Sequence, residues 1–232
     1  MKKEILSILV FGALISFLSC KKDEPKIGTQ ITANEDTPVT DYDGNSYKTM
    51  KIGNQIWMAE NLKSTHYSDG TPITSFSYGN DDANVLVYGR LYRWSAIMKG
   101  ASSSNSNPSN IQGIAPNGWH VPSSAEWQQL IDYLGGVSLA GGKLKEVGIV
   151  HWTSPNEGAA NESKFNALPA GMYAFWNEFQ WKGEHAAFAT TTDASAPDHP
   201  ACITVKLDYN STLATIGQFH PDDAVSVRCV KD

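Results

Sequence analysis

The chain has no excess of positive charge and no basic cluster. Its 232 residues contain 18 Lys and Arg against 24 Asp and Glu, a formal net charge of −6 at pH 7. A protein that binds the phosphate backbone of nucleic acid needs a positive patch. We therefore expect no nucleic-acid partner.

The sequence also lacks an apolar run long enough to span a membrane. The run from Ile5 to Leu18 is shorter than the roughly 20 residues that a bilayer requires. It follows a Lys-Lys pair and ends at Ser19-Cys20. A basic start, a short apolar stretch and a small residue before the cut are typical of a secretory signal peptide. A buried N-terminal helix is the alternative.

The cysteine after this stretch points to a lipoprotein. Phe17-Leu18-Ser19-Cys20 resembles the bacterial lipobox. We interpret residues 1–19 as a signal peptide and Cys20 as a lipidated residue that anchors the chain to a membrane. Residues 20–40 are interpreted as a flexible tether, because they contain no aromatic residue and little apolar surface to bury. Residues 41–232 then form one domain at the outer membrane or cell surface.

The sequence patterns of enzymes are missing. No Gly-x-Ser-x-Gly motif, phosphate loop or dinucleotide fingerprint occurs, and the six histidines show no zinc-ligand spacing. We expect no catalysis, no metal site and no cofactor, and we interpret His120 as a structural hydrogen-bonding residue. Calcium stays open as an alternative, because the loop acids Asp81-Asp82 and Asp222-Asp223 could supply oxygen ligands.

The pattern along the domain predicts an α+β fold with two or three helices and an antiparallel sheet. Turn signals at Asp43-Gly44-Asn45 and Gly53-Asn54 predict a small meander. Apolar spacing predicts one helix from Tyr88 to Lys99 and a short one from Leu139 to Val147. Ser123 with Glu126 forms a capping box, which predicts a helix ending near Leu134. Alternating apolar residues after Phe165, as in 203–209 and 225–229, predict strands.

Several ordered motifs resemble the Fibrobacter succinogenes major paralogous domain, a family of bacterial surface lipoprotein domains. The motifs are Asp43-Gly44-Asn45-Ser46-Tyr47, Ile56-Trp57-Met58-Ala59-Glu60-Asn61-Leu62, Tyr88-Gly89-Arg90-Leu91-Tyr92, Pro116-Asn117-Gly118-Trp119-His120-Val121-Pro122, Ala125-Glu126-Trp127, Ala167-Leu168-Pro169-Ala170-Gly171 and Val227-Arg228-Cys229-Val230-Lys231-Asp232. The family looks like a member of the C-type lectin-like group, which includes sulfatase-modifying-factor domains. The shared feature is a proline before a capped helix with Glu-Trp. The resemblance therefore implies a C-type lectin-like domain.

Besides Cys20, the chain has only Cys202 and Cys229. Both fall in late segments with a strand pattern, and conditions outside the cytoplasm permit oxidation. We therefore predict a disulfide between them. The family's usual cysteine before its Pro-x-Gly-Trp motif is Ala115 here, and Cys202 would take its place.

Aromatic residues gather among polar ones between residues 173 and 181. Tyr173, Phe175, Trp176 and Trp181 are the candidate ligand-binding residues, because flat aromatic rings stack on sugars. The alternative is that these rings pack on the sheet as core residues.

These features together predict a lipid-anchored cell-surface binding or adhesion module without catalysis. Its ligand would be a glycan or another surface protein. Two alternatives stay open: an enzyme related to the sulfatase-modifying-factor branch, and a structural lipoprotein of the cell envelope.

Overall fold

The computed structural model describes residues 33–232. The predicted signal peptide and Cys20 lie outside these residues. The described part has a mixed α+β fold dominated by antiparallel sheets, with four α-helices instead of the two or three expected. None of the helices in residues 33–232 is long and apolar enough to cross a bilayer.

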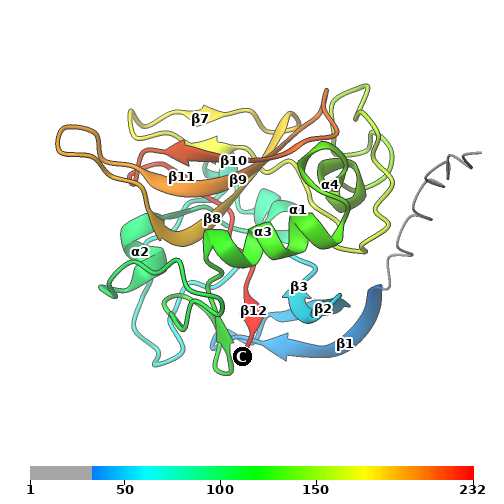
Figure 1. Cartoon of the computed structure of the whole chain (residues 1–232). Coiled ribbons are helices and arrows are strands. Elements are labelled where there is room, and N and C mark those ends of the chain that lie inside the picture. Colours follow the sequence, from blue (N-terminus) through cyan, green and yellow to red (C-terminus); the bar gives the residue numbers. More distant parts are fainter. Residues whose placement is uncertain (1–32) are drawn as a thin grey trace, which may run out of the picture.

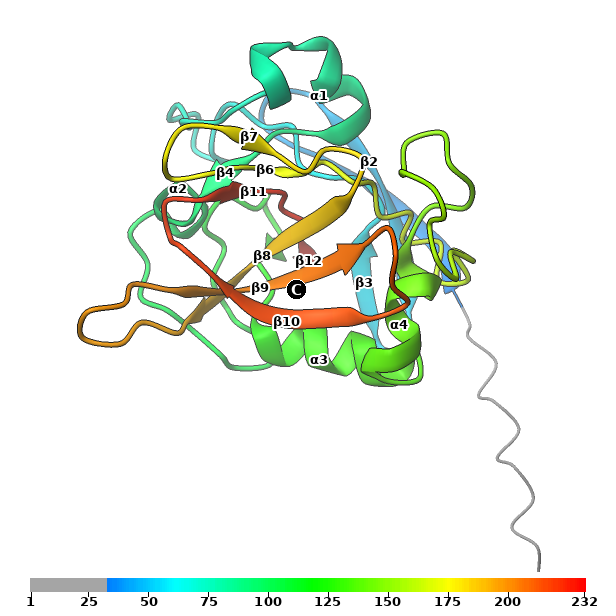
Figure 2. The ribbon, with the colours of Figure 1, turned by 90° about the horizontal axis from the view of Figure 1, so that it is seen from above.

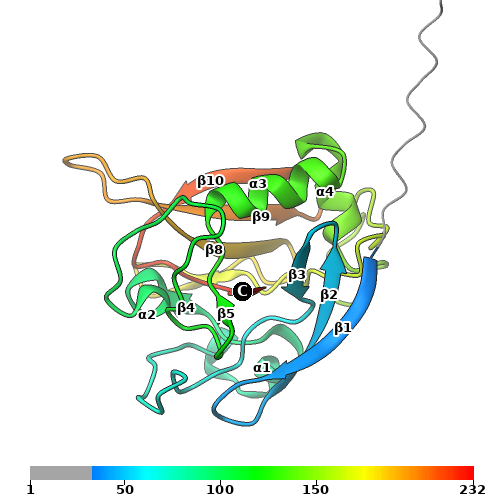
Figure 3. The same ribbon diagram turned by 60° about the horizontal axis from the view of Figure 1, so that its bottom comes forward.

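The first sheet joins the beginning of the described chain to its last strand. Its order is β1-β2-β3-β12-β5, and all its pairs are antiparallel (Figure 3). The strands are β1 (Ala33–Thr40), β2 (Ser46–Ile52), β3 (Gln55–Met58), β12 (Val230–Lys231) and β5 (Trp119–His120). The meander predicted from the two turn signals is confirmed as β1, β2 and β3.

The prediction that the tether extends to residue 40 is wrong, because residues 33–40 form β1. In β1 only Val39 is buried. Backbone pairing with β2, from Ala33 opposite Ile52 to Thr40 opposite Ser46, orders the segment. Composition gave no sign of this strand, because an edge strand needs few apolar side chains when its neighbour supplies the hydrogen bonds.

Two further sheets form the other half of the molecule (Figure 2). A three-stranded sheet has the order β10-β9-β8, and a four-stranded sheet has the order β4-β11-β6-β7. The first contains β8 (His185–Asp193), β9 (Cys202–Asp208) and β10 (Ala214–Phe219); the second contains β4 (Tyr92–Arg93), β11 (Ala224–Val225), β6 (Met172–Tyr173) and β7 (Phe179–Gln180).

The helices confirm the capping signal and correct another prediction. They are η1 (Tyr78–Asn80), α1 (Ala83–Tyr88), α2 (Trp94–Met98), α3 (Ser124–Tyr133) and α4 (Val137–Leu144). At the start of α3, Ser123 Oγ accepts from the Glu126 amide at 3.2 Å, and the Glu126 carboxylate accepts from the Ser123 amide at 2.9 Å. The capping box is confirmed.

The single helix predicted from Tyr88 to Lys99 is wrong, because the chain breaks at Gly89. Its φ is +74°, and a Cβ there would lie 2.7 Å from the Asn61 Cβ. Only glycine accepts both conditions. Helix α1 therefore ends at Tyr88, and the short α2 begins at Trp94 after strand β4.

Helix α3 fills the space between two sheets (Figure 1). Trp127 is fully buried, with its ring 4.7 Å from Trp57 of β3 and 5.3 Å from Phe188 of β8. Trp127, Leu130 and Ile131 are spaced i, i+3 and i+4 and are all buried, so they form one apolar face. The helix thus supports both the first sheet and the three-stranded sheet.

The predicted disulfide is wrong: Cys202 and Cys229 are both free and buried. Cys202 begins β9, where its Sγ lies 3.7 Å from the Phe219 carbonyl oxygen. Cys229 directly precedes β12 of the first sheet, and its carbonyl accepts from the Met58 amide at 3.0 Å. Cys202 thus lies in the three-stranded sheet and Cys229 next to the first sheet, which their shared strand pattern could not reveal.

Candidate functional site

A short hairpin places the predicted aromatic residues. Gly171 leads into β6 with φ +67°, and a Cβ there would lie 2.2 Å from the Gln180 carbonyl oxygen. Glycine therefore lets β7 approach β6 closely. The turn closes through the Asn177 amide, which donates to the Ala174 carbonyl at 2.8 Å. Asn177 itself has φ +68°, a conformation that asparagine tolerates.

The hairpin and the connection after β10 lie on the same side of the molecule (Figure 2). Between them is a groove of about 240 Å³, which we call the aromatic groove. Its lining residues are Met172, Phe175, Trp176, Trp181, Gln218, Phe219, His220 and Asp223.

Three of the four predicted aromatic residues meet in this groove. The exposed fractions are 48% for Phe175, 49% for Trp176 and 41% for Trp181. The Phe175 and Trp176 rings meet edge to face at 4.9 Å, and the His220 ring lies 4.5 Å from the Phe175 ring. Of the two interpretations that the sequence left open, packing as core residues is therefore wrong for these three side chains.

Trp181 is held in an unusual backbone conformation. Its φ is +63°, a region that costs a bulky residue roughly 1–2 kcal/mol. Its carbonyl accepts from the amides of Glu184 and His185, each at 3.0 Å, and its indole meets the His185 ring at 5.0 Å. Surrounding contacts therefore hold the indole in place against local preference, a pattern that clusters at functional sites.

A carboxylate forms the polar part of the groove. Asp223 accepts from the Phe175 amide at 2.9 Å and from the His220 amide at 3.1 Å. Burial raises the pKa of this carboxyl above its ordinary value, and the two amide donors only partly offset that effect. Asp223 thus fixes the hairpin and the β10–β11 connection relative to each other.

Tyr173, the fourth predicted residue, does not line the groove. Its ring packs 4.4 Å from Phe76 and 4.6 Å from Phe179 in a small aromatic cluster. Residues 173 and 175 have different neighbours because the turn begins at Ala174. Tyr173 therefore fits the alternative interpretation, a ring that packs on the sheet.

The groove contains residues that the sequence did not single out as sugar ligands. Gln218 lies in strand β10, and His220 comes directly after it. Asp223 was considered only as a calcium ligand. The signal that could have found them is the polar segment His220-Pro221-Asp222-Asp223 after a strand. Within the part of the chain that the structure describes, no three His, Cys, Asp or Glu side chains gather to hold a metal ion.

Two other polar sites have structural roles. His120 is buried; its Nε2 lies 2.7 Å from Glu126 and its Nδ1 lies 2.7 Å from Asp232, as its interpretation as a hydrogen-bonding residue required. Asp41 accepts from the Asn45 amide at 2.8 Å, which makes this segment a turn.

The model of one family, the Fibrobacter succinogenes major domain, matches residues 50–231. The chain belongs to this family. The match includes both segments of the aromatic groove, while the whole of β1 lies outside it. No curated protein and no solved structure matches the chain. The support for the candidate site in this member of the family is therefore the geometry of this chain alone.

Proposed function

We propose that this Fibrobacter succinogenes major domain is a non-catalytic saccharide-binding module at the cell surface. The observation that supports it is the aromatic groove, where three exposed rings lie beside an imidazole, an amide and a carboxylate. Apolar rings stack on the C–H faces of sugars, and polar groups select hydroxyls by hydrogen bonding. Exposed apolar patches of this kind on soluble domains commonly mark interaction sites.

The size of the groove suits part of a polymer. Small-molecule pockets span roughly 300–1,000 Å³, whereas this groove has about 240 Å³. It is too small to enclose a long oligosaccharide. We infer that it holds the end of a glycan chain or one or two of its rings. A C-type lectin-like fold, suggested by the proline before the capped helix α3, is part of the same proposal.

The enzyme alternative receives no support from the thiols. A reactive cysteine must ionise near neutral pH. Burial raises the pKa of the Cys202 thiol to about 12 and that of Cys229 even further. Both thiols stay protonated, so the cysteine chemistry of the sulfatase-modifying-factor branch does not extend to this pair.

The anchoring at Cys20 is proposed from the sequence. The full-length wild type should enter the detergent phase on phase separation, and Cys20→Ala should move the protein to the aqueous phase. Equal partitioning of the two proteins would contradict anchoring and leave the groove proposal untouched.

The groove is tested by native gel electrophoresis of the full-length protein through gels containing neutral or acidic polysaccharides. Wild type should be retarded by at least one of them. Trp176→Ala and Trp181→Ala should each weaken binding about tenfold or more, as loss of a central aromatic anchor does.

Tyr42→Ala is the matched control, because Tyr42 is 61% exposed and lies outside the groove. Its retardation should equal that of wild type. Retained binding in both tryptophan variants, or no retardation of wild type by any polysaccharide, would refute the proposed function.

A further inference from the structure

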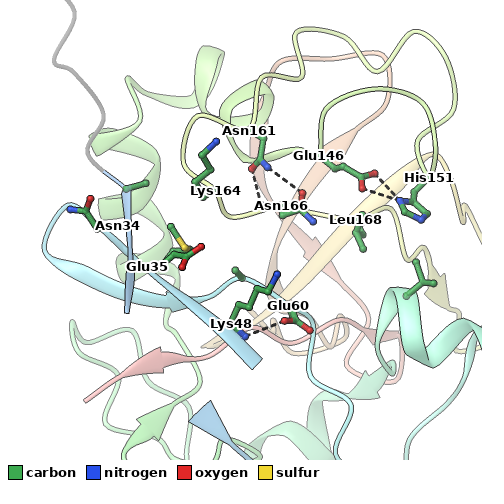
Figure 4. Close-up of a pocket in the computed structure, with 14 residues that line it drawn as sticks. Asn34, Glu35, Lys48, Glu60, Glu146, His151, Asn161, Lys164, Asn166 and Leu168 are labelled. Atoms are coloured by element: carbon green, nitrogen blue, oxygen red, sulfur yellow. Dashed lines mark hydrogen bonds and ion pairs between the residues drawn. The ribbon is translucent and has the colours of Figure 1, made fainter. Parts of the chain in front are cut away.

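A second and larger cavity lies on another part of the molecule. We call it the polar cleft; its volume is about 730 Å³ (Figure 4). It lies between the β1–β2 part of the first sheet and the segment 146–168. Its lining residues are Ala33, Asn34, Glu35, Lys48, Met50, Ala59, Glu60, Val87, Glu146, His151, Asn161, Lys164, Asn166 and Leu168.

The floor of the polar cleft is one face of a two-stranded region. Glu35 lies opposite Met50 in the β1–β2 register, and directly opposed residues share a face. Lys48 is two residues before Met50 and projects to the same side. Figure 4 shows the Lys48 side chain reaching up from this floor toward the space below Asn166. The floor thus combines an acid, a base and an apolar side chain.

The facing wall has a left-handed backbone at three positions and is held in place by hydrogen bonds. Asn161, Lys164 and Asn166 all have positive φ, at +47°, +57° and +55°. Asn161 and Asn166 bond to each other: the Asn161 amide nitrogen donates to the Asn166 side-chain oxygen at 3.2 Å, and the Asn166 backbone amide donates back at 2.9 Å. Asparagine tolerates this region, and the two hydrogen bonds fix it, which indicates a preorganised surface.

A buried arginine supports this wall from below. The Arg228 guanidinium donates to the Asn166 carbonyl at 3.0 Å and to the Phe165 carbonyl, and its Nε donates to the Asn61 side-chain oxygen at 2.8 Å. It also stacks 4.2 Å from the Phe165 ring centroid. The wall is therefore fixed to the core.

Some charges in the polar cleft are already paired. The Glu146 carboxylate lies 2.8 Å from His151 Nδ1, and the Glu60 carboxylate lies 3.2 Å from the Lys63 ammonium. In contrast, the side chains of Glu35, Lys48 and Lys164 have no hydrogen bond or ion pair within residues 33–232. Charges of both signs thus remain free to meet a ligand.

The apolar lining is aliphatic. It consists of Ala33, Met50, Ala59, Val87 and Leu168, and the only ring is the His151 imidazole. A sugar would find no flat aromatic face here. A peptide matches every component, since it supplies charges of both signs, backbone amides for asparagine side chains and aliphatic groups for the wall.

We propose that the polar cleft binds a peptide segment of mixed charge presented by a partner protein. An acidic side chain of that segment meets Lys48, a basic one meets Glu35, and its backbone bonds to the Asn34 and Asn166 amides. This function is separate from the proposed saccharide binding at the aromatic groove.

The test is an array of immobilised pentapeptides composed of Ala, Leu, Asn, Glu and Lys, probed with the full-length protein. Peptides containing both Glu and Lys should bind about tenfold more strongly than uncharged ones, as two added charge pairs allow. Trp181→Ala should leave peptide binding unchanged. The test of the polar cleft is therefore independent of the test of the aromatic groove.

Two single variants then separate the charges. Lys48→Gln should weaken binding about fivefold only for peptides with Glu, and Glu35→Gln only for peptides with Lys. Lys51→Gln is the control, because Lys51 is an exposed lysine on the same strand outside the cleft. Equal binding of charged and uncharged peptides would overturn the proposal. Binding of purely acidic peptides and oligogalacturonate instead would also overturn it and indicate a simple anion site.

Discussion

The aromatic groove and the polar cleft show two ways of building a surface on one domain. The groove is small, and two segments of the chain, 172–181 and 218–223, form it. The cleft is about three times larger, and it joins residues from 33 to 168. Aromatic rings bind neutral ligands by stacking. Unpaired charges of both signs bind charged ligands by ion pairing, and salt weakens that binding. The two surfaces are therefore expected to act on different partners.

The largest effect is expected where the polar cleft depends on the core. Arg228→Ala leaves the carbonyls of Phe165 and Asn166 without their buried donor. The free energy of unfolding should fall by about 3 kcal/mol or more, measured by urea denaturation. Lys231→Ala, which removes one exposed ion pair with Asp36, should cost about 0.5 kcal/mol or less.

Hydrogen exchange in Arg228→Ala would show whether the two surfaces are independent. Exchange should rise at residues 161–168 and stay unchanged at 172–181. An equal rise in both segments would mean that the groove and the cleft unfold as one cooperative unit. This result would contradict the independence of the two surfaces.

A smaller effect is expected in the groove, at the strained position of Trp181. Because its φ is +63°, Trp181→Gly should be more stable than Trp181→Ala by about 1 kcal/mol. At Trp176, whose φ is not positive, glycine should instead be less stable than alanine by about 0.5 kcal/mol. Urea midpoints of the four variants measure this. The same order at both positions would contradict the strain argument.

The smallest effect concerns the pH response of the groove. Burial raises the folded-state pKa of Asp223 above its ordinary 3.8. On acidification the folded chain therefore takes up this proton before the unfolded chain does. Protonation of Asp223 stabilises the fold slightly, and this contribution is lost as the pH rises through the folded-state pKa.

Acidification should have the opposite effect on polysaccharide affinity: protonation of Asp223 stabilises the fold but weakens binding. The affinity should fall about threefold as Asp223 is protonated, because the carboxylate is a stronger acceptor than the neutral acid. Retardation gels run at a series of pH values below 6 measure the change, and Asp223→Asn should remove it. An unchanged pH response in Asp223→Asn would show that another group is responsible.

Parts of the fold that depend on neighbours in the sequence were predictable. The capped helix α3 follows from Ser123 and Glu126, whose side chains bond across one turn. Hairpins followed from their turn residues. The aromatic groove was partly predictable, because Phe175, Trp176 and Trp181 are close in sequence and stood out as candidates among polar residues, although the sequence left their exposure open.

Distant contacts decided what the sequence concealed. The order of β1 depends on its pairing with β2, and the end of α1 depends on how closely Gly89 approaches Asn61. The cysteines have similar local patterns, yet Cys202 lies in the three-stranded sheet and Cys229 precedes β12 of the first sheet. None of these relations leaves a periodicity in the chain, because periodicity reports only the face of an element and not its partner.

The sequence by itself determined the α+β class, the capped helix and the turns of the meander, since these depend on interactions over a few positions. Only the tertiary structure decided that His220 and Asp223 complete the aromatic groove, and that Glu35, Lys48 and Lys164 face one cleft. The physical reason is chain connectivity: residues far apart along the chain become neighbours only when the sheets and α3 pack around a shared core.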